Sequence, residues 1–166
     1  MAYSLEQLSD RQDIIDVLFA YCRAIDDNRP DDVITMFTDD CEYDYGGDHG
    51  LFSTKDHAYM FFRAGTDKIY KRSAHYVSNI EVSFSGPDRA DSIAYVNAWH
   101  EFNDDISNAW FFGRYVDHFV RTGDGWRIAG RRVDTMGHEA WPREVTHMER
   151  NVLPPRNPAG SGPGAP

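Results

Sequence analysis

The chain has 166 residues and a formal net charge of −10, from 17 lysine and arginine residues and 27 aspartate and glutamate residues. The whole acidic excess lies in residues 1–50, which hold 3 basic and 13 acidic residues, whereas the remainder holds 14 of each. Nucleic acids and anionic membranes both attract clustered positive charge, so this balance argues against either as a partner.

Length and cysteine content indicate one domain in a reducing compartment. A chain of this size can bury a core without disulfides, and its two cysteines make no disulfide framework. The sequence has no apolar run of the roughly 18 residues that a membrane span needs. Its first ten residues lack the basic and apolar regions of a signal peptide. We therefore expect a cytoplasmic protein.

Helical periodicity is strongest near the N-terminus. Apolar residues recur at three- and four-residue spacing and predict an amphipathic helix over about residues 9–27. Ser9 followed by Gln12 is the pattern of a capping box at its start. Pro30 favours the first turn of a second short helix, which we expect to end at residues 37–38.

The next segment predicts a short hairpin and a third helix. Residues 41–45 alternate as a strand does, and residues 51–52 can return beside them. Ser53 or Thr54 can cap a helix that runs to about Ala64. The period then changes to two, which predicts four strands joined by tight turns: residues 73–85, 90–102, 108–121 and 126–136.

This order of elements predicts an α+β fold, with a curved antiparallel sheet that carries the helices on one face. We expect a single domain over residues 1–150. The last 13 residues hold five of the eight prolines and no apolar side chain larger than alanine. Such a segment buries too little surface to offset the entropy of ordering, so residues 151–166 are predicted to form a flexible tail.

Four stretches, taken in order, carry a family resemblance. They are IIDVLFAYCRAID, MFTDDCEYDY, RSAHYVSNIEV and DGWRIAGRRV. The chain resembles the nuclear-transport-factor-two-like superfamily. Within it, the chain is similar to the SnoaL-like group of polyketide cyclases, scytalone and bile-acid dehydratases and the hexachlorocyclohexane dehydrochlorinase. The resemblance covers about residues 8–140. It implies a cone in which the curved sheet surrounds a pocket and three N-terminal helices close it.

The resemblance also implies catalytic residues. The aspartate of "AID" is Asp26 and the histidine of "SAHY" is His75. In members with this pair, the histidine is the general base and the aspartate orients it. Tyr21 matches a tyrosine of the dehydratases, and Arg131 matches an arginine that lines the pocket in some members. The chain departs from the paired-aspartate pattern of ketosteroid isomerase, which puts that activity in doubt.

An Asp–His pair suits the removal of a proton from carbon. Neutral imidazole can accept a proton near neutral pH, and a buried carboxylate fixes its tautomer and stabilises the imidazolium that forms. The alternative is that Asp26 merely ends a helix and that His75 is a hydrogen-bonded strand residue without a catalytic role.

Helical phase favours Asp26 over its neighbour Asp27. Asp26 follows Cys22 by four residues on an apolar face that we expect to include Phe19. Asp27 lies about 100° further round, nearer the polar side. The other acids of the N-terminal excess, Asp10 among them, are expected on exposed helix faces or at the ends of elements.

Further pocket candidates come from the strands. Tyr43 and Tyr45 share one strand face, where they can line the pocket or pack in the core. On the long strands, alternation defines sets of residues without telling which set faces inward. The candidate substrate-binding residues are Tyr43, Tyr45, Asn97, Trp99, Trp110, Phe112, Arg114 and Arg131.

The sequence gives no sign of a metal or cofactor. Its seven histidines lack metal-ligand spacing, and there is no glycine-rich phosphate loop. We expect a cofactor-independent lyase of the dehydratase type, acting on a hydrophobic, oxygenated aromatic, polycyclic or steroid-like molecule.

Several alternatives remain open. An isomerase, a cyclase or a retro-aldol lyase would use the same pair of residues. A non-catalytic ligand-binding or scaffold protein, such as a dioxygenase small subunit, would not. The long aromatic strands also predict self-association, as a dimer or a trimer.

Overall fold

A computed structural model of the chain describes residues 3–46, 50–103 and 107–142. The predicted tail at 151–166 and the end of the predicted domain at 143–150 lie outside these residues. None of the described helices is both long enough and apolar enough to cross a membrane.

Helix α1 (Leu5–Asp26) begins about one turn earlier than predicted. The Ser4 hydroxyl accepts a hydrogen bond from the Gln7 backbone N–H at 3.1 Å, and the Gln7 side chain accepts one from the Ser4 N–H at 3.0 Å. The capping box predicted at Ser9 is therefore wrong. The same Ser-x-x-Gln pattern occurs twice, and the copy further along the chain lies inside the helix.

The buried face of α1 differs slightly from the predicted one. Ile14, Leu18 and Tyr21 lie on it and are each less than 5% exposed. Phe19 is 38% exposed, so its expected place on this face is wrong. The face is centred on Leu18, and the next residue points about 100° away from it.

Asp10 is a second correction on α1. It was expected to be solvated but is only 6% exposed. Its carboxylate accepts hydrogen bonds from Arg121 Nη2 at 2.6 Å and from Trp126 Nε1 at 3.2 Å. The Arg121 guanidinium holds the pKa of Asp10 below its usual value. A carboxylate can be buried when it is paired in this way, and the pairing ties α1 to the sheet.

The short elements follow largely as predicted. Thr54 caps α3 by accepting a hydrogen bond from the His57 N–H. A π-helical turn then leads into the first long strand, a feature that the periodicity did not predict. The elements are α2 (Pro30–Thr35), β1 (Phe37–Asp44), β2 (Leu51–Phe52), α3 (Lys55–Ala64) and η1 (Gly65–Ile69).

Four long strands build most of the sheet: β3 (Tyr70–Phe84), β4 (Arg89–Phe102), β5 (Ser107–Thr122) and β6 (Gly125–Pro142). The six described strands form one sheet in the order β2-β1-β6-β5-β4-β3. All neighbours are antiparallel except β1 and β6, which are parallel. Only a tight hairpin forces neighbours to be antiparallel, and β1 reaches β6 through a long connection.

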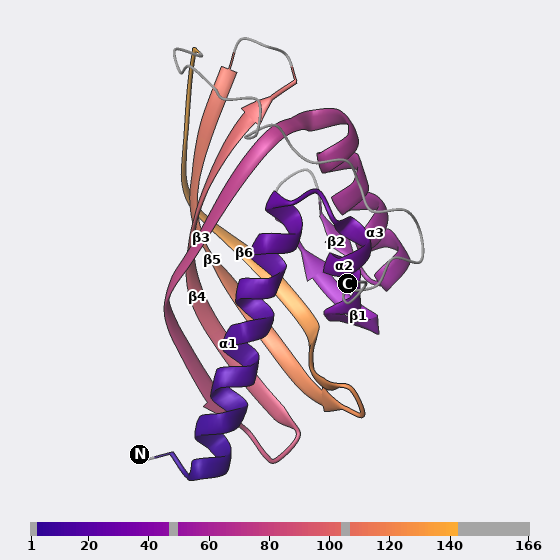
Figure 1. The fold of residues 1–166 in the computed structure, drawn as a ribbon, viewed down its shortest axis with the longest axis vertical. Coiled ribbons are helices and arrows are strands. Elements are labelled where there is room, and N and C mark those ends of the chain that lie inside the picture. Colours follow the sequence, from indigo (N-terminus) through magenta and orange to yellow (C-terminus); the bar gives the residue numbers. More distant parts are fainter. Residues whose placement is uncertain (1–2, 47–49, 104–106, 143–166) are drawn as a thin grey trace, which may run out of the picture.

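The helices lie on one side of this curved sheet. Figure 1 shows α1 along one face of the long strands, with α2, α3 and the short strands grouped beside it. We call the face covered by α1 the inner face and the opposite one the outer face. The inner face of β4 carries small residues such as Ala90, Ala94 and Ala98, all buried. Small side chains let the helix approach closely and leave room for a cavity at one end.

Candidate active site

A cavity of about 250 Å³ lies where the C-terminal end of α1 meets β1, α3 and the inner face of the sheet. We call it the inner cavity. Its described walls are mostly aromatic and its polar groups are few, as is typical of small-molecule sites. The tyrosines and histidines among its lining residues are Tyr21, Tyr43, Tyr45, Tyr70, His75, His100 and Tyr115.

Asp26 and His75 form a hydrogen-bonded pair at this cavity, which we call the dyad. Asp26 is the last residue of α1, and its Oδ1 lies 2.7 Å from His75 Nδ1. The Ser73 hydroxyl donates to the same oxygen at 2.8 Å, and the His75 backbone N–H donates to Oδ2 at 2.8 Å. Three donors therefore converge on one carboxylate.

The charge on Asp26 determines the tautomer of His75. Burial by itself would raise the pKa of Asp26, but the hydrogen bonds and charge from His75 outweigh it and hold the pKa below its usual value. An ionised carboxylate only accepts hydrogen bonds, so in the neutral form of His75 the proton lies on Nδ1 and Nε2 keeps a free lone pair. The neighbouring Asp27 instead pairs with Arg29 at 3.1 Å and is more exposed.

Two buried tyrosines meet inside the cavity wall. The hydroxyls of Tyr21 and Tyr43 lie 3.4 Å apart, so one donates to the other. Burial raises the pKa of Tyr21 and raises that of Tyr43 well above its usual value. Both phenols therefore stay protonated at neutral pH. The phenol that accepts within this pair keeps its own O–H free to donate to a substrate oxygen. Tyr45, the third predicted tyrosine, also lines the cavity.

Arg131 does not line the inner cavity, contrary to the prediction. It is buried behind the wall, where Nε and Nη2 donate to the two Asp117 oxygens at 2.7 and 2.8 Å. Its guanidinium lies 4.2 Å from the Tyr21 ring centre and 4.1 Å from that of Tyr115. Because Arg131 pairs with the buried Asp117 carboxylate on the neighbouring strand, its guanidinium packs against the two tyrosine rings and does not face the cavity.

Five other predicted lining residues lie on the outer face of the sheet. Strand alternation groups them correctly, but the opposite set faces the cavity. Trp99 pairs with Trp110 across β4 and β5, one position from the inward pair of Ala98 and Phe111. The corrected residues are Asn97, Trp99, Trp110, Phe112 and Arg114, and none of them is among the described lining residues.

His100 is one of the site residues that the sequence did not predict; Ser73, Tyr70 and Tyr115 are others. Its ring lies edge-on to His75 with centroids 5.3 Å apart. Burial, assisted by the charge of His75, lowers the pKa of His100 to about 3, so it stays neutral beside the dyad. The alternation of small residues along β4 was an available signal, since a helix packs against the small side and His100 continues that series.

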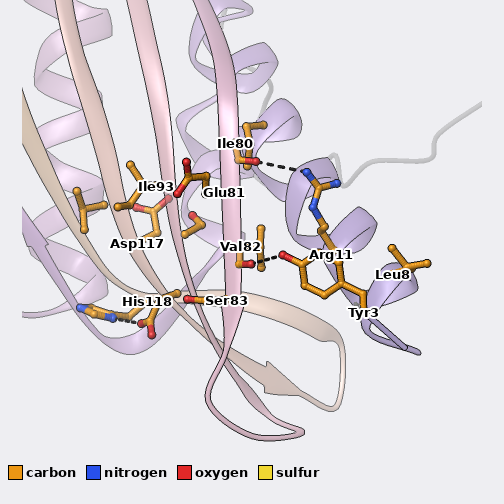
Figure 2. A pocket seen from close by; sticks show the side chains of 13 residues that line it. Tyr3, Leu8, Arg11, Ile80, Glu81, Val82, Ser83, Ile93, Asp117 and His118 are labelled. Carbon is orange, nitrogen blue, oxygen red and sulfur yellow. Dashed lines mark hydrogen bonds and ion pairs between the residues drawn. The ribbon is translucent and has the colours of Figure 1, made fainter. Parts of the chain in front are cut away.

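A larger cleft of about 630 Å³ lies at the edge of the sheet beside β3. Tyr3, which precedes α1, donates to the carbonyl of Val82 at 2.7 Å, and Arg11 of α1 donates to that of Ile80 at 3.3 Å. Figure 2 shows both contacts. These bonds occupy carbonyls on the open edge of β3. The cleft also holds a second Asp–His pair, formed by residues 91 and 118, whose side chains are 51% and 69% exposed.

Burial separates the two Asp–His pairs. The exposed pair is surrounded by water, which weakens its mutual interaction. The dyad at the inner cavity lies among apolar walls, where catalytic groups are normally found. We therefore take the inner cavity as the candidate active site. Among the described residues, no three His, Cys, Asp or Glu side chains converge as a metal site.

Sequence comparison gives a family match over most of the chain. The family model described as a SnoaL-like domain matches residues 6–132. An uncharacterized protein of Mycobacterium tuberculosis is 36% identical over 136 residues, which cover 80% of this chain and 88% of that protein.

Solved structures with the same fold include two that are named for elimination enzymes. A candidate scytalone dehydratase from Novosphingobium aromaticivorans has a TM-score of 0.76 at 22% identity, covering 90% of this chain and 95% of that one. A hexachlorocyclohexane dehydrochlorinase from Novosphingobium barchaimii has a TM-score of 0.75 at 17% identity, covering 87% and 97%. At these identities the likeness concerns the fold, whereas the family match rests on sequence. The chain belongs to the SnoaL-like family.

Proposed function

We propose that the inner cavity is the active site of a cofactor-independent lyase. The substrate is a hydrophobic, oxygenated aromatic, polycyclic or steroid-like molecule, which loses water or another small group. One observation carries the proposal: Asp26 and His75 are 2.7 Å apart at a cavity walled by tyrosines and phenylalanines. The names of the structural neighbours, a dehydratase and a dehydrochlorinase, support elimination as the reaction type.

In this proposal His75 is the general base. Nε2 takes a proton from a carbon of the substrate. The carbon–oxygen bond on the adjacent carbon breaks, and a double bond forms between the two carbons. Asp26 holds Nδ1–H and stabilises the imidazolium. The removed proton and the departing hydroxide together make water, so the elimination needs no co-reactant. General-base catalysis of this kind contributes about 10²–10⁴-fold.

Tyr21 and Tyr43 are proposed to act on the departing oxygen. Their hydroxyls are 3.4 Å apart, and burial keeps both protonated. Such donors stabilise developing negative charge by hydrogen bonding. Their raised pKa values make complete proton transfer from either phenol unfavourable, which leaves the imidazolium as the acid that completes the water molecule.

The alternatives differ in the step after proton removal. Isomerisation, cyclisation and retro-aldol cleavage all begin with the same base, and only product analysis separates them from elimination. A non-catalytic scaffold would be expected to fill this space with side chains. A cavity of about 250 Å³ beside the dyad favours the enzyme.

Proton removal can be tested before the substrate is known. Oxygenated aromatics and steroids that raise the melting temperature are incubated with the protein in deuterium oxide, and mass spectrometry measures exchange at acidic carbons. We expect exchange or turnover with the wild type and nearly complete loss in Asp26→Asn and His75→Ala. The exposed pair supplies matched controls, Asp91→Asn and His118→Ala, which should retain activity. Wild-type activity in both dyad variants, on a substrate that the wild type converts, would refute the assignment.

We further propose that copies of the chain associate through the outer face. Trp99, Trp110 and Phe112 are only half-buried there, and Ile93 and Tyr95 are 39% and 38% exposed. A contiguous aromatic face of this kind is unusual on a monomer. A dimer or a trimer would cover it.

A further inference from the structure

A second cavity adjoins the inner one. It measures about 280 Å³, and Tyr45, Tyr70 and His100 line both cavities. Its remaining described walls include Phe102 and Phe111, with polar side chains from β6. We call it the second cavity. No part of the proposed elimination uses it.

A row of rings connects the dyad to the second cavity. His75 lies edge-on to His100 at 5.3 Å, and His100 lies against Tyr70 at 4.4 Å. Tyr70 then contacts Phe102 at 5.4 Å. These are ordinary distances between interacting aromatic rings. The rings thus form an unbroken series of contacts from His75, at the inner cavity, to Phe102, at the second cavity.

A β-bulge in β6 directs two side chains into this cavity. Gly137 pairs with Phe112 and Thr135 with Gly113, so Met136 is the extra residue between two consecutive partners on β5. Without it, positions three apart in a strand would face opposite sides. With it, Thr135 and His138 line the same cavity, while Met136 lines neither cavity and is 59% exposed.

The cavity volumes indicate the size of the occupant. Sites for small organic ligands usually measure about 300–1,000 Å³. The cavities of about 250 and 280 Å³ each fall below that range, and the two together fall within it. We infer that the substrate has two parts: an oxygenated ring held at His75, and an apolar extension the size of a second ring that occupies the second cavity. This inference rests on the proposed function of the inner cavity.

The test compares two fluorescent probes that differ only in the extension. Naphthol supplies a hydroxylated ring system, and phenylnaphthol carries a phenyl group on the ring distal to the hydroxyl. Burying a phenyl group against apolar walls favours the longer probe by at least about tenfold in Kd. We expect this preference in fluorescence titrations of the wild type. Equal affinities, or no binding of either probe, would overturn the inference.

Substitutions at the β-bulge of β6 test whether the apolar extension of the substrate lies in the second cavity. Thr135 is exposed, and a tryptophan in its place should fill the second cavity. Thr135→Trp should therefore abolish the tighter binding of phenylnaphthol and leave the Kd of naphthol unchanged. Met136→Trp adds the same side chain one residue away and should leave both affinities unchanged. His138→Trp gives a second filling variant should Thr135→Trp fail to fold. Loss of the preference in Met136→Trp as well, or its retention in both filling variants, contradicts the assignment.

Binding and catalysis are separable by these measurements. The titrations are repeated in His75→Ala, which lacks the proposed base and should keep the tenfold preference for phenylnaphthol. If the preference is present while dyad variants retain turnover, the lyase proposal fails and the second cavity stands. If the preference is absent while dyad variants lose turnover, the second cavity fails and the lyase proposal stands.

Discussion

The carboxylate of Asp26 accepts two hydrogen bonds from one residue, His75: the ring Nδ1–H at 2.7 Å and the backbone N–H at 2.8 Å. This two-point contact fixes the imidazole relative to the backbone of β3 and ties the last residue of α1 to that strand. Ring orientation, tautomer and the junction between helix and sheet therefore depend on the same side chain.

Asp26→Asn should change the tautomer of His75 without removing the ring. An amide NH₂ placed toward Nδ1 favours the form with the proton on Nε2, and that form has no free lone pair for the substrate. We expect proton exchange or turnover to fall by about 10²–10⁴-fold. Nitrogen NMR of labelled histidine should show the proton moving from Nδ1 to Nε2. An unchanged tautomer together with unchanged activity would contradict this role of Asp26.

The loss of folding stability at acidic pH should depend on the Asp26 carboxylate. The pKa of Asp26 is lowered in the folded protein, so its contribution is present above the unfolded value and is lost as the pH falls through the folded one. The difference in unfolding free energy between wild type and Asp26→Asn should therefore shrink as the pH falls below about 4. Urea titrations at several pH values measure it. A difference that grows with acidity would be inconsistent with an ionised Asp26.

His100 should govern stability in a higher pH range. Burial lowers its pKa to about 3, so between pH 7 and pH 5 the unfolded chain binds a proton there that the folded protein does not. The wild type should lose roughly 2 kcal/mol more unfolding free energy over this interval than His100→Phe, which cannot be protonated. Equal losses in the two proteins would show that His100 is accessible to water and protons.

The pair of Arg131 and Asp117 should be strongly coupled. Both side chains are fully buried, so Arg131→Met leaves an unpaired carboxylate in the core and should cost about 3–5 kcal/mol of unfolding free energy. Adding Asp117→Leu removes the orphaned charge and should recover most of the loss. Denaturant unfolding of the two single variants and the double variant gives the coupling. Additive effects would mean that the pair does not interact as the geometry indicates.

Charge on the outer face should disrupt self-association. Ile93→Lys combined with Tyr95→Lys places two like charges on the exposed aromatic face and should shift the protein toward a monomer in light scattering. Leu5→Lys is the control, because Leu5 is exposed at the start of α1, on the opposite side of the sheet. A wild-type protein that is monomeric at high concentration would rule out this interface.

Local patterns predicted the elements that dominate the fold, because each depends on near neighbours in the chain. The period of 3.6 in α1 placed Asp26 rather than Asp27 at the core-facing end of the helix. The period of two identified the four long strands to within three residues at each end, except that β6 runs six residues past its predicted end at 136. The duplicated Ser-x-x-Gln pattern shows the limit of such signals, since both copies satisfy the same local rule.

The sequence by itself determined the order of elements, the family and the residues of the dyad, because these depend on local periodicity and on motifs carried in the chain. Tertiary structure alone decided which strand face lines the cavity. Alternation along a strand defines two faces but does not tell which of them a helix will cover. In this fold α1 packs on the face where β4 carries alanines. That choice placed His100 beside His75 and put Trp99 outside. It also brought Asp117 to Arg131, a contact between strands that no pattern along one strand can specify.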